Sequence, residues 1–130
     1  MKGAFDMSKT VATIIGVVFV LVGILGFASP HLLGAHFSPA HNIIHLVTGA
    51  LSLYFGLKGS LSSAALFSIV FGAVYLLLGV AGYVVGTGPD HIFRVVPETL
   101  VFGTMDHIIH LLLGAIYLVV GIYNRASITV

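Results

Sequence analysis

Charge is scarce in this chain of 130 residues, which has five basic and four acidic side chains. Charged residues make up 7% of the sequence, whereas an average soluble domain has about 25%. So few charges cannot cover a surface that faces water, and a soluble monomer is therefore excluded. The sequence is also 58% hydrophobic, which excludes intrinsic disorder because disorder requires low hydrophobicity and high charge.

Several other features are missing. The chain has no cysteine, which excludes disulfides, thiolate metal sites and cysteine nucleophiles. It has no run of basic residues, which excludes nucleic acid as a partner. It also has no hydrolase triad, phosphate-binding loop or nucleotide-binding fingerprint, so we predict that the protein is not an enzyme. An acidic residue in mid-membrane is missing too, which disfavours ion-driven transport.

The sequence does contain long apolar segments. They predict helices over residues of about 11–28, 39–58, 61–86 and 104–124. Each is close to the roughly 20 residues that a helix needs to cross a bilayer. In lipid, each backbone amide must be satisfied within its own segment, which favours helices. The predicted fold is therefore an all-α, integral membrane four-helix bundle, with residues 1–130 forming a single transmembrane domain.

The few cations predict an orientation in the membrane. Lys2 and Lys9 precede the first segment, Lys58 lies between the second and third, and Arg125 follows the fourth. Only Arg94 falls on the other side. Because cytoplasmic loops carry the excess of lysine and arginine, we expect both termini in the cytoplasm. The predicted location is the inner (plasma) membrane, as a multi-pass protein with the lipid bilayer as its first partner.

The chain also contains an internal repeat. Residues 41–50, HNIIHLVTGA, match residues 106–115, DHIIHLLLGA, at an offset of 65. Four further matches relate the first segment to the third at an offset of 56: Gly16, Gly23, Gly26 and Phe27 match Gly72, Gly79, Gly82 and Tyr83. We therefore predict two tandem helical hairpins, over about 11–58 and 61–125. Each hairpin crosses twice, so a pseudo-two-fold axis along the membrane normal should relate them.

Helical spacing places the polar residues and the glycines of the repeated motif on one stripe of each helix. Small residues at such a stripe let helices approach closely in lipid, so the stripes should face the interior of the bundle. The two stripes are His41, His45, Gly49, Ser52 and Gly56, and Asp106, His110, Gly114, Tyr117 and Gly121.

The histidines and the acidic residue of these stripes form the candidate site. His41 and His45 are spaced i, i+4, and Asp106 and His110 occupy the equivalent positions. If the pseudo-two-fold axis holds, three imidazoles and one carboxylate converge at the outer end of the bundle. Such a ligand set suits zinc or another divalent metal. Asn42 and His107 occupy matched positions one residue further on and are candidate supporting partners.

Three interpretations of this cluster stay open. In the first, the cluster is a structural clasp, that is, a hydrogen-bonded network that holds the helices together. The protein would then be a non-enzymatic accessory or scaffold component that forms a homo-oligomer or belongs to a larger membrane complex. In the second, His41, His45, Asp106 and His110 bind a metal. In the third, the protein is a haem-binding redox protein with His45 and His110 as axial ligands, although the glycine stripes favour close helix contact over room for a porphyrin.

The remaining polar residues are expected in loops. The long segment 87–105 is expected to fold onto the membrane surface as a lid, with Asp90 and Arg94 forming a local ion pair. The other histidines are expected at the membrane interface: His31, His36 and His91.

In its repeated motif, His41-Asn42-x-x-His45 and Asp106-x-x-x-His110, the chain resembles a family of small bacterial four-helix membrane proteins known only as a domain of unknown function. The pattern in each half of that family is (His/Asp)-Asn-x-x-His-Leu-x-x-Gly. The resemblance covers residues of about 11–123, and His107 departs from it because the pattern has asparagine there. It implies the fold and the membrane location, and it implies no activity.

Overall fold

The computed structural model describes residues 6–129, so Lys2 lies outside the described residues. Within that range the chain forms four α-helices: α1 (Met7–Ala28), α2 (Pro39–Leu57), α3 (Leu61–Val85) and α4 (Thr104–Thr129). A short 3-10 helix, η1 (Leu32–Gly34), lies between α1 and α2, and two strands, β1 (Phe93–Val96) and β2 (Leu100–Phe102), lie between α3 and α4. The protein is therefore mostly helical.

Three of the helices, α1, α3 and α4, are long and apolar enough to cross a membrane. Their composition makes this a membrane protein. The fourth, α2, has 19 residues and falls outside that set, because His41, Asn42 and His45 in its first turns lower its mean hydropathy. Its start follows the sequence prediction: the Ser38 hydroxyl accepts a hydrogen bond from the backbone N–H of His41 at 3.2 Å, and Pro39 opens the helix.

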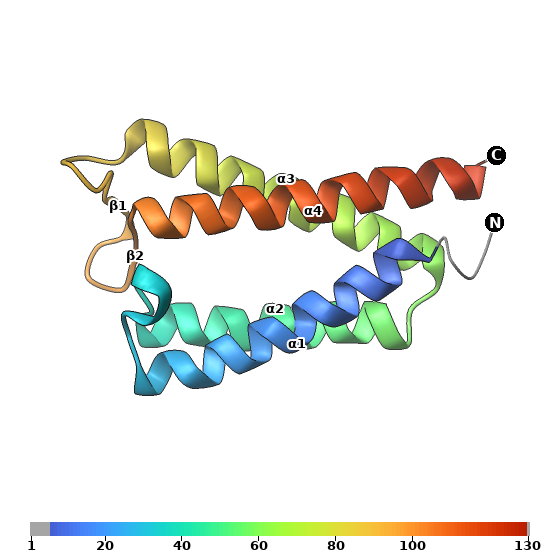
Figure 1. Ribbon diagram of the computed structural model, residues 1–130, viewed down its shortest axis with the longest axis horizontal. Coiled ribbons are helices and arrows are strands. Elements are labelled where there is room, and N and C mark those ends of the chain that lie inside the picture. The colour runs from blue at the N-terminus through green and yellow to red at the C-terminus, as the bar shows by residue number, and fades with distance from the viewer. Residues whose placement is uncertain (1–5, 130) are drawn as a thin grey trace.

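The helices are arranged as two pairs. α1 packs chiefly on α2, and α3 chiefly on α4 (Figure 1). The chain runs back and forth, so that η1 and the two strands lie at one end of the molecule, which we call the loop end. The start of α1, the turn between α2 and α3, and the end of α4 lie at the other, which we call the terminal end.

Glycines bring the helices of each pair into backbone contact. A β-carbon on Gly16 of α1 would lie 2.9 Å from the backbone nitrogen of Leu53 in α2. A β-carbon on Gly72 of α3 would lie 2.6 Å from the backbone nitrogen of Leu118 in α4. Both distances are too short for a real side chain, so these glycines are needed for close packing, as the sequence predicts for helices in lipid.

Contacts between the two pairs occur at both ends and in the middle. At the terminal end, the backbone N–H of Ser8 donates to the Asn124 side-chain oxygen at 2.5 Å. In the middle, the hydroxyls of Ser52 and Tyr117 lie 2.7 Å apart, both fully buried. The third set of contacts, at the loop end, contains the candidate site.

The segment 87–105 differs from the prediction. It contains an antiparallel hairpin in which Phe93 pairs with Phe102 and Arg94 with Val101, so the chain is mostly, and not entirely, helical. Within residues 6–129 no ion pair joins Asp90 to Arg94. The i, i+4 relation that would join them requires a helix, and Arg94 lies in β1 instead.

Candidate functional site

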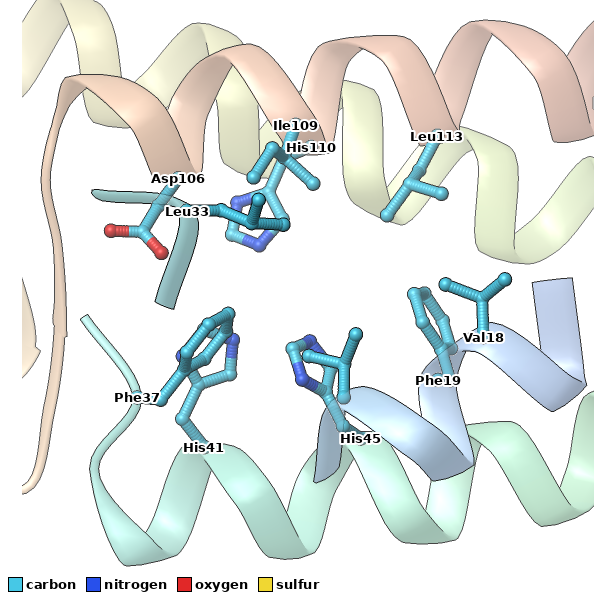
Figure 2. Close-up of a pocket in the computed structure, with 11 residues that line it drawn as sticks. Val18, Phe19, Leu33, Phe37, His41, His45, Asp106, Ile109, His110 and Leu113 are labelled. Atoms are coloured by element: carbon cyan, nitrogen blue, oxygen red, sulfur yellow. The ribbon is translucent and has the colours of Figure 1, made fainter. Parts of the chain in front are cut away.

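Three imidazoles meet at the loop end. The cap at Ser38 places His41 in the first turn of α2 and His45 one turn later, and His110 comes from α4. The ring centres of His41 and His45 are 4.3 Å apart, and those of His41 and His110 are 6.3 Å apart. All three side chains are buried, and Figure 2 shows their rings facing one space between α2 and α4. The structure thus brings together the three histidines that the repeat predicts.

Aromatic rings surround this cluster. They come from α1, the connection before α2, α3 and β2: Phe19, Phe37, Tyr75 and Phe102. Phe19 stacks on His45 with ring centres 5.1 Å apart and planes 18° apart. Phe102 meets His110 edge to face at 4.8 Å. The imidazoles therefore lie in an apolar environment, where an unpaired polar atom is unfavourable.

The hydrogen bonds of the three rings are unequal. Nδ1 of His41 lies 2.8 Å from the backbone oxygen of His36. A carbonyl oxygen only accepts, so this nitrogen carries the hydrogen and, in the neutral ring, Nε2 keeps a lone pair. In contrast, Nδ1 of His45 and Nδ1 of His110 are buried without a hydrogen-bond partner in the described part of the chain. Leaving such an atom unpaired costs about 1–3 kcal/mol.

Asp106 has a different set of partners from the one predicted. Its buried carboxylate accepts a hydrogen bond from the backbone N–H of Gly103 at 2.9 Å, in the manner of a residue that caps its own helix. It also accepts the backbone N–H of His36 at 3.2 Å and lies 3.1 Å from Nδ1 of the same residue. Figure 2 shows this carboxylate turned toward the loop end rather than toward the ring of His45.

His36 is the residue that sequence reasoning missed. It was expected at the membrane interface, yet its imidazole lies within hydrogen-bond distance of Asp106, across 70 positions of sequence. No local pattern marks a contact between a loop residue and a helix so far away. The contact between Asp106 and Gly103 could have been predicted, because a carboxylate at the third position of a helix often accepts a hydrogen bond from the backbone N–H of the capping residue.

Asn42 and His107 do not support the imidazoles in the way that was expected. The Asn42 amide packs against Gly26 of α1, and the His107 ring packs against Gly82 of α3. His107 also donates from Nε2 to the backbone oxygen of His91 at 2.7 Å. Each therefore fills the space that a glycine leaves in its own helix pair, at matched places in the two pairs.

Two cavities flank the histidines. The larger, of about 160 Å³, lies between α1, α2 and α4, and its walls are apolar apart from His41, His45, His110 and Asp106. The smaller, of about 90 Å³, lies between α2, α3 and the strands, and is lined by the same three histidines together with Tyr75 and Leu78 among others. The histidines thus form a layer with a cavity on each side.

The comparison with known families finds an uncharacterised family, as the resemblance predicts. A family model described as Domain of unknown function (DUF4383) matches residues 9–123. The chain belongs to this family. No curated protein and no solved structure matches it. Membership in an uncharacterised family is thereby confirmed, and the DUF4383 assignment adds no activity.

For this DUF4383 chain, the metal and haem interpretations stay predictions. Among the described residues, no group of three or more histidine, aspartate or glutamate side chains is arranged to hold a metal ion. The rings of His41, His45 and His110 converge, but the oxygens of Asp106 already bind Gly103 and His36.

Proposed function

We propose that the protein is a non-enzymatic integral membrane protein whose polar His/Asp cluster at the loop end, which includes His36, is a structural clasp. Asp106 is the observation that carries this proposal. Its carboxylate joins the start of α4 to the connection that precedes α2, through His36 and Gly103. Both oxygens of this buried carboxylate already have hydrogen-bond partners, which leaves it little capacity to bind a metal or a substrate, and the contact with His36 holds one helix pair to the other.

The path of the chain supports four membrane crossings. α1 and α3 both run from the terminal end to the loop end (Figure 1), so α2 has to return the chain if those two helices cross. A helix of 19 residues is about 28 Å long at 1.5 Å per residue, close to the hydrocarbon thickness of about 30 Å. We therefore propose a four-helix transmembrane bundle.

Contacts between equivalent residues support the proposed internal symmetry. Ser52 and Tyr117, which are 65 positions apart, share a hydrogen bond. Phe19 and Tyr75 are equivalent at the offset of 56, and their ring centres are 5.8 Å apart. Residues related by a two-fold axis touch each other only where that axis passes between them. We propose that the two hairpins are related by a pseudo-two-fold axis along the membrane normal.

Charge supports the orientation. Lys9, Lys58 and Arg125 belong to the terminal end, and Arg94 belongs to the loop end. We place the protein in the plasma membrane. By the positive-inside rule, the terminal end then faces the cytoplasm, and the histidine layer lies toward the outer side.

The proposed role is that of an accessory or scaffold component, as a homo-oligomer or within a larger membrane complex. Most of the described chain is helical, so partners would bind mainly along the helix faces. These faces carry exposed apolar side chains, such as Ile14, Leu77 and Leu112.

Elemental analysis tests the clasp against a metal site. Protein purified in mild detergent without chelators should contain no stoichiometric metal and show no Soret band. His36→Ala should lower the thermal midpoint, because it removes the ring that binds Asp106. A stoichiometric metal that is lost in both His45→Ala and His110→Ala would instead establish a metal-binding protein, and a Soret band lost in the same variants would establish a haem protein.

A further inference from the structure

Two imidazoles that line the larger cavity between α1, α2 and α4 each have one polar atom without a hydrogen-bond partner in the described part of the chain. His45 and His110, only 7% and 3% exposed, face this space in Figure 2. Nδ1 of each ring has no hydrogen-bond partner in the part of the chain that the structure describes. Buried polar atoms in native proteins almost always have one. A molecule in the cavity, beside these two rings, would provide a partner once a ring turns toward it.

The size of the cavity limits that molecule. Its volume is about 160 Å³. A dry cavity of about 150 Å³ engineered into another protein binds benzene. A single six-membered ring therefore fits, and Phe19 and Phe37 in the walls provide aromatic surfaces for it.

The charges around the cavity require a neutral molecule. The described side chains that line it include neither lysine nor arginine, so an anion would have no counter-ion. The one carboxylate, that of Asp106, is already bound to His36, so a cation would have to compete with that contact. A neutral molecule avoids both difficulties.

The exposed side chains that line the cavity are apolar. Val18 on α1 and Leu33 in η1 line the cavity and are 47% and 65% exposed. Around the apolar helices of a membrane protein, such exposed side chains contact acyl chains. A ligand would therefore enter from the bilayer and must be soluble in it.

We propose that this cavity binds a neutral, lipid-soluble molecule with one ring and a hydrogen-bonding oxygen, of the phenol or quinone type, with that oxygen next to His45 and His110. A neutral imidazole has one donor and one acceptor nitrogen, so it can accept from a phenol hydroxyl or donate to a quinone carbonyl. The inference rests on the proposed membrane location. It goes beyond the proposed clasp, which does not depend on whether a ligand binds.

Histidine ring resonances test this binding. Protein with nitrogen-15 histidine, in lipid nanodiscs, is titrated with phenol and with toluene, which has nearly the same size and no oxygen. We expect phenol to shift the ring resonances of His45 and His110 in a saturable way, with an affinity about tenfold above that of toluene, as one added hydrogen bond would give. Equal effects of the two probes, a shift linear in concentration, or no shift at all would overturn the proposal; the last result would mean that the cavity holds only water.

Matched variants locate the site. Val22→Phe fills the larger cavity, and Leu78→Phe makes the equivalent change in the smaller one. We expect the first to lower the affinity for phenol by about tenfold or more, and the second to leave it nearly unchanged. Leu113→Phe, also in the larger cavity, replaces Val22→Phe if that variant does not fold. Unchanged binding in the cavity-filling variant would refute the site.

A third arm distinguishes a free phenol from the ring of a membrane quinone. A quinone with one isoprenoid unit is added to the phenol-bound protein. If its tail leaves past Val18 into lipid, it displaces phenol and reverses the histidine shifts, which identifies a quinone headgroup site. If it fails to displace phenol, the cavity takes free phenols only. The clasp is measured separately, by the stability of His36→Ala, so either proposal can fail alone.

Discussion

The carboxylate of Asp106 and the imidazole of His36 lie 3.1 Å apart, although 70 positions separate them in the chain. The same carboxylate also accepts the backbone N–H of His36. This double contact fixes the connection before α2 against the start of α4. Phe37, the next residue of that connection, packs against His41 and His45, so the position of the histidine layer depends on Asp106.

Asp106→Asn should destabilise the protein by about 1–3 kcal/mol, because it weakens buried hydrogen bonds that a charged group accepts. The measurement is thermal unfolding in detergent, followed by circular dichroism. Asp90→Asn is the matched control, since that side chain is exposed at the same end of the molecule. Equal midpoints for the two variants would show that the contact with His36 contributes nothing.

Gly72→Ala should separate α3 from α4. The added β-carbon would meet the backbone of Leu118 and the backbone oxygen of Gly114, neither of which can move without moving its helix. We expect a loss of about 1–3 kcal/mol, the usual cost of overpacking. Ala73→Leu, at an exposed position one residue further on, should change the midpoint little. A variant Gly72→Ala as stable as the parent would contradict the close helix contact.

Tyr117→Phe should cost about 0.5–1.5 kcal/mol. The Ser52 hydroxyl donates its hydrogen to the backbone oxygen of Ala12 at 2.6 Å, so the Tyr117 hydroxyl donates to Ser52. Removing the Tyr117 hydroxyl deletes a buried hydrogen bond between the helix pairs. Tyr54→Phe is the control, because Tyr54 is 59% exposed. The comparison uses midpoints measured in the same detergent.

Cysteine labelling should establish the orientation, because the chain has no cysteine of its own. A maleimide that cannot cross membranes should label Glu98→Cys, in the turn between β1 and β2, from outside intact cells. It should label Lys58→Cys, in the turn between α2 and α3, only after the cells are permeabilised. Both positions are exposed. The reverse pattern would place the termini outside.

Much of the helical architecture could be predicted from the sequence, because lipid leaves a helix few alternatives. The length of the apolar segments predicted the helices, and Ser38-Pro39 predicted the start of α2, where the Ser38 hydroxyl caps the helix as expected. The i, i+4 spacing gave the stripe that carries His41 and His45, because in a helix that spacing alone determines the face.

Features that depend on contacts distant in sequence could not be predicted. Phe93–Val96 and Leu100–Phe102 are short apolar runs, which fit a surface segment as well as a hairpin until their pairing is seen. Asp106 was placed on the correct stripe, but its partner His36 lies in a connection without periodicity. The sequence therefore indicated which residues gather at the loop end, and not which of them bind one another.

The hydrogen bond between Ser8 and Asn124 means that the first turn of α1 and the last turns of α4 lie side by side. A short peptide could join these two ends, and the chain could then be opened in the turn at Gly59. Such a circular permutant would begin with the α3–α4 hairpin and finish with the α1–α2 hairpin, yet every interhelical contact would stay in place. The order in which the two hairpins are synthesised is thus separable from the structure that they form.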